Sequence, residues 1–146
     1  MATSLGGARV PGWYWALATL ALLWEALGCF AYLNQVGMDA AELAQLPAAQ
    51  RDIWMAMPAG VVAAYAVAVW IGLTGAVGLL LRRRWARLAF AASLIAVIVQ
   101  FGWIFAATPI LSTIGPSAAA FPAVIVIVGA FLLWFSGFAA KRGWLR

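Results

Sequence analysis

The 146-residue chain is 67% hydrophobic and only 9% charged, whereas ordinary soluble domains carry roughly 25% charged residues, so a water-soluble fold of this length is excluded. Its net charge of +5 does not indicate nucleic-acid binding, because the basic residues flank apolar runs instead of lining one polar face. Cys29 is the only cysteine and histidine is absent, which excludes an intramolecular disulfide and the common His/Cys metal sites, and we expect no cofactor.

Four apolar runs follow one another along the chain, each near the ~20 residues that cross a hydrocarbon core. They predict helices over residues 13–33, 56–81, 85–107 and 118–140. Turn residues at 108–117 divide the uncharged stretch that would otherwise be too long for one crossing. The sequence therefore predicts an all-α membrane protein, a single domain over residues 1–146 that forms an antiparallel bundle of four transmembrane helices.

The basic residues predict the orientation of this bundle. Eight of the nine lie before the first run, between the second and third, or after the fourth, and Arg51 alone lies on the other side. Because cytoplasmic loops are enriched in Lys and Arg, both termini are expected in the cytoplasm, at a bacterial inner membrane. Arg82, Arg83, Arg84 and Arg87 form a basic cluster that is expected to face the lipid at the cytoplasmic surface. The cluster fits this topological role, and binding of anionic lipid is the alternative.

Tryptophans stand near the predicted helix boundaries, where an amphipathic indole is favoured. They are Trp13, Trp15, Trp54, Trp85 and Trp144. We interpret them as interfacial anchors, with stacking on a ligand as the alternative.

The loop over residues 34–55 is the longest connection. Asp39 stands three residues before Glu42, which is the spacing of a capping box, and Pro47 ends the run that follows. This pattern predicts a short amphipathic helix over residues 39–46 on the outer surface. We expect it to cover the mouth of the bundle; a gate or a docking element for a partner is the alternative.

Glu25 is the only acid within a predicted crossing. A charge near a helix centre costs roughly 2.5 to 3.5 kcal/mol on insertion scales, so this side chain should face protein or a wet cavity. Spacings of three and four residues place it on one helix stripe with Tyr14, Ala18, Ala21, Gly28 and Tyr32. That stripe is predicted to face the other helices.

Small residues at regular spacing mark further contact faces, because they let two membrane helices approach closely. The predicted packing positions are Gly28, Gly60, Ala64, Ala68, Gly72, Gly75, Ala92 and Ala96.

A polar layer is predicted around Glu25. Counting about 1.5 Å per residue from outer ends near Leu33, Met57 and Thr108 places three side chains on the order of 12 Å below the outer boundary: Glu25, Tyr65 and Gln100. Burial would favour a protonated, hydrogen-bonded carboxyl. We favour a neutral interhelical hydrogen bond that fixes packing, worth about 0.6 kcal/mol, over a proton or cation site, because no second acid or base accompanies it.

Several segments resemble a known family. Residues 11–15 (PGWYW), 23–28 (LWEALG), 72–83 (GLTGAVGLLLRR) and 143–145 (GWL) are similar to segments of an uncharacterised family of small bacterial inner-membrane proteins of about this length. The resemblance implies four membrane helices and an inner-membrane location, and some members carry an automatically assigned sugar-transporter label. Members often have Asn at the position of Glu25, and the resemblance implies no catalytic residues.

A looser similarity links the second predicted helix to small multidrug-resistance exporters. Residues 64–67 (AYAV) and 70–73 (WIGL) resemble part of that family's third helix, so the order differs and membership is not implied. The similarity serves as an analogy for a lone membrane glutamate that a homodimer duplicates.

Three classes of function remain open. The first is a non-enzymatic accessory protein that binds a lipid, another membrane protein or a second copy of itself through its small-residue faces. The second is a small oligomeric transporter with Glu25 as its proton or cation site. An enzyme comes last, because no nucleophile, acid and base share one depth.

Overall fold

The computed structural model describes residues 8–146, and a long helix corresponds to each of the four predicted crossings. The elements are α1 (Gly12–Val36), α2 (Ala40–Gln45), α3 (Ala48–Ala56), α4 (Ala59–Leu80), α5 (Ala86–Ala107), α6 (Ile110–Thr113), a 3-10 turn η1 (Pro116–Ala119) and α7 (Ala120–Lys141). Helices α1, α4 and α5, and α7 together with η1, are long and apolar enough to cross a membrane. The predicted all-α membrane fold is confirmed.

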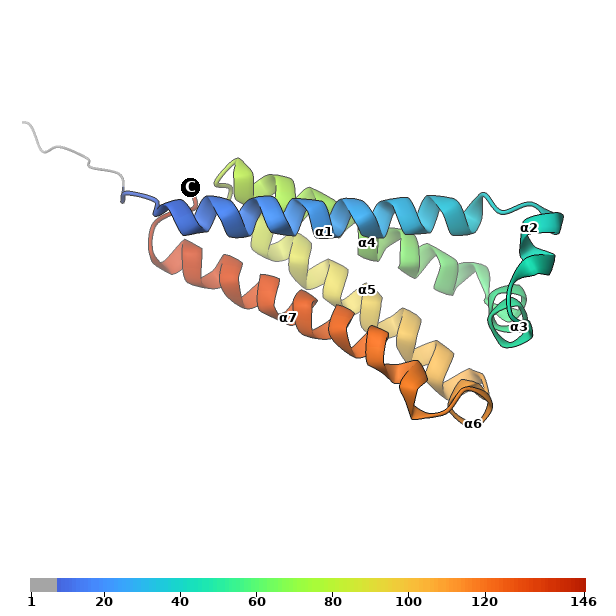
Figure 1. Ribbon diagram of the computed structural model, residues 1–146. Helices are drawn as coiled ribbons and strands as arrows, with labels where there is room; N and C mark the ends of the chain where they lie inside the picture. Colours follow the sequence, from blue (N-terminus) through green and yellow to red (C-terminus); the bar gives the residue numbers. More distant parts are fainter. Residues whose placement is uncertain (1–7) are drawn as a thin grey trace, which may run out of the picture.

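The four long helices run antiparallel in chain order (Figure 1). Helix α4 packs against both α1 and α5, and α7 packs against α5. One end of the bundle holds the turn between α4 and α5 and both ends of the described chain, and with them eight of the nine basic residues. We call this the basic end. The opposite end carries α2, α3 and α6 and is called the open end.

Helix α7 ends at the basic end in a Schellman motif, a turn in which one left-handed residue reverses the chain. Gly143 takes that conformation with φ 73°, and the Trp144 amide donates to the Ala139 carbonyl at 3.0 Å. Arg82 holds the equivalent place after α4, with φ 57°. Glycine adopts this conformation freely, whereas a side chain is strained there, so the contacts of Arg82 must hold it in place.

The C-terminal residues provide those contacts. The Arg146 amide donates to the Arg82 carbonyl at 2.6 Å, and the Arg84 amide donates to the Arg146 carbonyl at 3.0 Å. The Nε of Arg82 also donates to the Trp144 carbonyl at 2.7 Å. Arg82 is therefore half-buried, and its predicted lipid-facing position is wrong, because its guanidinium binds the chain's own backbone. The rest of the cluster is exposed, namely Arg83, Arg84 and Arg87.

Trp144 is buried, so its predicted position as an interfacial anchor is also wrong. The Schellman turn folds it back into the bundle, where its ring centroid lies 5.7 Å from that of Tyr14 and 5.5 Å from that of Phe138. Such a contact between the residue after the turn and the last helical residues commonly accompanies this motif. Trp13, Trp15 and Trp85 are exposed.

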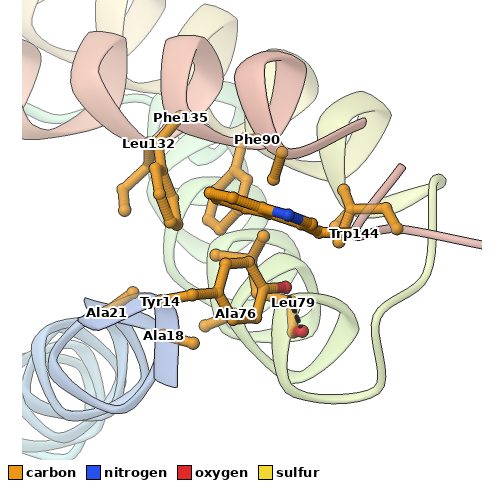
Figure 2. Packing of buried hydrophobic residues seen from close by; sticks show 12 residues of the cluster. Tyr14, Ala18, Ala21, Ala76, Leu79, Phe90, Leu132, Phe135 and Trp144 are labelled. Atoms are coloured by element: carbon orange, nitrogen blue, oxygen red, sulfur yellow. Dashed lines mark hydrogen bonds between the residues drawn. The ribbon is translucent and has the colours of Figure 1, made fainter. Parts of the chain in front are cut away.

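An aromatic core joins all four long helices at the basic end (Figure 2). Tyr14 of α1, Phe90 of α5 and Phe135 of α7 are each 2% exposed or less. The Tyr14 hydroxyl donates to the Leu79 carbonyl of α4 at 2.6 Å, shown by the dashed line in Figure 2. The inward stripe predicted for α1 is confirmed at this end, since its alanines, Ala18 and Ala21, are buried in the same core.

Glycines on α4 bring this helix close to its neighbours. A methyl group added at Gly75 would lie 3.0 Å from the Phe90 ring, and one added at Gly78 would lie 3.0 Å from the Ala86 Cβ. Five of the predicted packing positions are buried or touch another helix, namely Gly28, Ala68, Gly72, Gly75 and Ala96. Ala64 is half-buried.

Gly60 and Ala92 are exposed, so the prediction that they pack inside this chain is wrong. Nothing lies within 4 Å of a methyl group added at Gly60. A row of residues spaced by four slowly winds around a helix, because one turn takes 3.6 residues, and three such steps rotate Gly60 by about 120° from Gly72.

The long connection at the open end contains two short helices, where the sequence predicts one. At α2, Asp39 Oδ1 accepts from the Glu42 amide at 2.8 Å and Glu42 Oε2 accepts from the Asp39 amide at 3.0 Å, which is a capping box. Pro47 ends this run and also begins α3, because its fixed φ suits a helix start. The sequence interpretation missed α3.

Candidate functional site

A cleft of about 1000 Å³ opens between the long helices, toward the open end. Helices α1 and α7 touch through the rings of Tyr14 and Phe135 at the basic end, 5.6 Å apart, and then diverge (Figure 1). Helices α4 and α5 form the back wall, and residues of α2 and α3 lie across the mouth. The volume stands at the upper end of the range typical of ligand sites, about 300 to 1,000 Å³.

Glu25 lies in this cleft, nearly midway along α1. Eleven residues separate it from the last residue of α1, Val36, which is about 16 Å along a helix. Its carboxyl group rests on the backbone of Gly72: a methyl group there would collide with Oε2 and would lie 2.8 Å from Cδ. The missing side chain of Gly72 thus makes the space that the carboxyl group occupies.

The hydroxyl of Ser93 borders the same space from α5. Its Oγ lies 3.0 Å from the position of a methyl group on Gly72, and it donates to the Ala68 carbonyl at 2.6 Å. Because its proton is committed to that carbonyl, Ser93 presents oxygen lone pairs toward the carboxyl group and not a donor. Gly72, Ser93 and Glu25 therefore come together from three helices.

The Glu25 carboxyl has no protein partner within residues 8–146. It is 9% exposed, yet no described group donates a hydrogen bond to it, and the ion pair found among those residues joins Arg51 and Asp52. Within the described residues, Arg82 Nη2 is the fully buried side-chain atom that lacks a hydrogen-bond partner, so the Glu25 oxygens keep some exposure to the cleft. No hydrogen bond to this carboxyl is found among those residues, so the favoured prediction of a neutral interhelical hydrogen bond stays a prediction.

Tyr65 and Gln100 line the same cleft but lie nearer the open end. They stand seven residues from Gly72 on α4 and from Ser93 on α5, which is about 10 Å along a helix. The prediction that they share one height with Glu25 is therefore wrong. The cleft instead has a carboxyl group at its deep end and an amide and a phenol two turns above it.

The predicted heights fail because two helix ends differ from the predicted ones. Helix α1 continues three residues past Leu33, and α4 begins two residues after Met57. The residue of α1 that is level with Tyr65 is Tyr32, whose ring centroid lies 5.0 Å from that of Tyr65.

The lining of the cleft is mostly apolar and aromatic, and its charged residues are acidic. Rings are contributed by Trp24, Trp54, Tyr65, Phe101, Phe105 and Phe121. Glu25 and Glu42 are its carboxyl groups, and no Lys or Arg of the described chain lines it. Such a site favours a ligand that combines apolar surface with positive charge, since carboxylates and aromatic faces both attract cations.

Cys29 lies one turn beyond Glu25 on α1 and is buried. Its thiol donates to the Val69 carbonyl at 3.3 Å. This contact ties α1 to α4 beside the cleft and gives the thiol a structural role. No cluster of three potential metal-binding side chains occurs in the part of the chain that the structure describes.

Comparison of the chain with protein families, characterised proteins and solved structures found no match. Its function is therefore inferred from the residues and geometry of the cleft. The three residues of the predicted polar layer, Glu25, Tyr65 and Gln100, all line the cleft. The divergence of α7 from α1 has no local signal in the sequence, because the residues at the rim of the cleft are apolar, as are residues that face lipid.

Proposed function

We propose that this protein is a membrane-embedded binding protein or small carrier for hydrophobic cations, and that Glu25 is its cation site. The observation that carries the proposal is the unpartnered Glu25 carboxyl at the deep end of an apolar cleft without basic residues. A charge in such a place is costly unless a counterion accompanies it. A bound cation would supply that counterion.

A proton and a cation would compete for the same carboxyl group. The other titratable groups near it are Cys29 and Tyr32 on its own helix, Tyr65 on α4 and Glu42 at the mouth, while α5 and α7 contribute none to the lining. Acidification should therefore weaken cation binding through Glu25. In the acidic limit of one-to-one competition, affinity falls about tenfold per pH unit.

The proposal is tested with purified protein in nanodiscs of zwitterionic lipid and tetraphenylphosphonium as the probe. We expect saturable binding that weakens as the pH falls. Glu25→Gln should lower affinity about tenfold or more, because a charged partner is lost, and should abolish the pH dependence. Asp52→Asn is the matched control, because this carboxyl is exposed and lies outside the cleft.

Unchanged affinity and pH dependence in folded Glu25→Gln would overturn the proposal and favour the accessory role. Circular dichroism and elution volume check that the variant folds. Glu25→Asp provides a second readout, because it keeps the charge but shortens its reach: binding should weaken while the pH dependence remains.

The proposed location is a bacterial inner membrane with both termini in the cytoplasm. The gathering of basic residues at one end of the bundle supports it. In this orientation the mouth of the cleft faces outward.

A further inference from the structure

Two side chains that line the cleft, one on α1 and one on α7, are also exposed on the outside of the bundle, and from them we infer a second opening of the cleft between these helices. We call it the seam. Leu27 of α1 and Phe121 of α7 both line the cleft and are 66% and 67% exposed, so each belongs to the interior wall and to the outer surface at once. Both belong to membrane-spanning helices. The medium outside the seam is therefore lipid acyl chain and not water.

The seam runs beside a polar path. Asn34, Gln35, Gln45, Gln50, Tyr65 and Gln100 line the cleft between its mouth and the deep carboxyl group. Helices α5 and α7 stay in contact beside the cleft: a methyl group added at Gly129 of α7 would lie 3.1 Å from Leu94 Cδ1 of α5. A ligand in the cleft can therefore make polar contacts inside it and reach apolar surroundings through the seam. Both run along the same length of the bundle.

Because the polar path and the seam run side by side, we propose that the ligand is a single-chain cationic amphiphile taken from the outer leaflet. This proposal rests on the proposed cation site. Its ammonium group follows the polar path down to Glu25, while its chain extends through the seam into the acyl region. The charge of the lining selects the headgroup, because Glu25 and Glu42 are its carboxyl groups and no described basic residue faces them.

This geometry limits the cost of moving the headgroup into the membrane. A free ammonium in hydrocarbon loses its hydration without compensation. Along the path, amide and phenol oxygens replace part of that hydration, and the carboxylate neutralises the charge at the end. The chain meanwhile stays in a medium like the one it left, so it needs no space inside the cleft.

The test compares two probes with the same headgroup, butyltrimethylammonium and dodecyltrimethylammonium. Leu27→Cys and Phe121→Cys are introduced separately into a Cys29→Ala background and alkylated with a bulky maleimide, which narrows the seam. Ile95→Cys carries the same label on the lipid-facing side of α5, where it is 63% exposed and outside the cleft. Binding to protein-free nanodiscs is subtracted.

We expect the seam labels to weaken dodecyl binding about tenfold more than butyl binding, because a blocked seam leaves the long chain no route from the cleft to the acyl region, whereas a butyl chain fits inside the cleft. The label at Ile95→Cys should change the ratio of the two affinities by less than about twofold. Equal losses for both probes, or no loss for either, would overturn the lateral route. Both of those results leave Glu25-dependent binding of tetraphenylphosphonium intact if the cation site itself is correct, so the two proposals can fail separately.

Discussion

The basic end and the open end of this bundle are built from the same four helices but differ in how those helices are held. At the basic end, aromatic rings from α1, α5 and α7 interlock, and the C-terminal residues are hydrogen-bonded to the turn between α4 and α5. At the open end, α1 and α7 separate around a cleft of about 1000 Å³.

The difference shows how a chain this small can have both a stable core and a binding site. Membrane helices gain little from hydrophobic burial and depend on close packing and hydrogen bonds. The basic end provides both, with Tyr14 bonded to Leu79 and glycines that admit Phe90. Because that end fixes the bundle, the other end can leave the Glu25 carboxyl without a partner.

The largest predicted contrast is between two phenylalanines of α7. Phe135 is 1% exposed in the core, whereas Phe121 is 67% exposed at the rim of the cleft. Phe135→Ala should lower the free energy of unfolding by about 3 kcal/mol or more, because it opens a cavity in packed protein. Phe121→Ala should change it by less than about 0.5 kcal/mol.

Unfolding by sodium dodecyl sulfate in mixed micelles, followed by circular dichroism, measures both variants. Similar losses for the two residues would mean that α7 is held as tightly at the open end as at the basic end. That result would contradict the division of the molecule into two regions.

A second contrast uses two glycines of the same helix, α4. A methyl group at Gly78 would lie 3.0 Å from Ala86 on a packed helix, whereas one at Gly72 would meet the end of the flexible Glu25 side chain. Gly78→Ala should therefore cost about 1 to 3 kcal/mol through overpacking. Gly72→Ala should cost less, because the carboxyl group can move into the cleft.

Cation affinity should rank these two glycine variants in the opposite order from stability. Displacing the Glu25 carboxyl should change the affinity for tetraphenylphosphonium in Gly72→Ala, while Gly78→Ala should retain its affinity as long as it is folded. Unaltered affinity in Gly72→Ala would show that cation binding does not depend on the position in which Gly72 holds the carboxyl group.

The sequence was sufficient for the four long helices and insufficient for their alignment. Apolar runs, turn residues and the capping pair at Asp39 and Glu42 are local signals, and the structure has helices and a capping box at those positions. Relative heights depend on how far each helix continues past its apolar run. An error of a few residues at the ends of α1 and α4 moved Glu25 two turns away from its predicted neighbours.

Tertiary contacts decide the other errors. The sequence position of Trp144 predicts an interfacial residue, but Gly143 reverses the chain and the side chain is buried. The sequence position of Arg82 predicts a member of a surface cluster, but its Nε donates to the backbone carbonyl of Trp144. The cleft itself depends on the tilt of α7, which is set by packing at the far end of that helix.

The smallest predicted contrast is between two tyrosines, and it isolates single hydroxyl groups. The Tyr14 hydroxyl donates to the Leu79 carbonyl, whereas no described residue is bonded to the hydroxyl of Tyr65, which lines the cleft. Tyr14→Phe should lower the free energy of unfolding by about 0.6 kcal/mol, the average for a hydrogen bond between membrane helices, and should leave cation affinity unchanged. Tyr65→Phe should leave stability unchanged and weaken binding of dodecyltrimethylammonium, since it removes a polar group from the path to Glu25. If Tyr65→Phe lost as much stability as Tyr14→Phe, the Tyr65 phenol would hold the fold together instead of serving the ligand. The open end would then be held by hydrogen bonds between helices, as the basic end is.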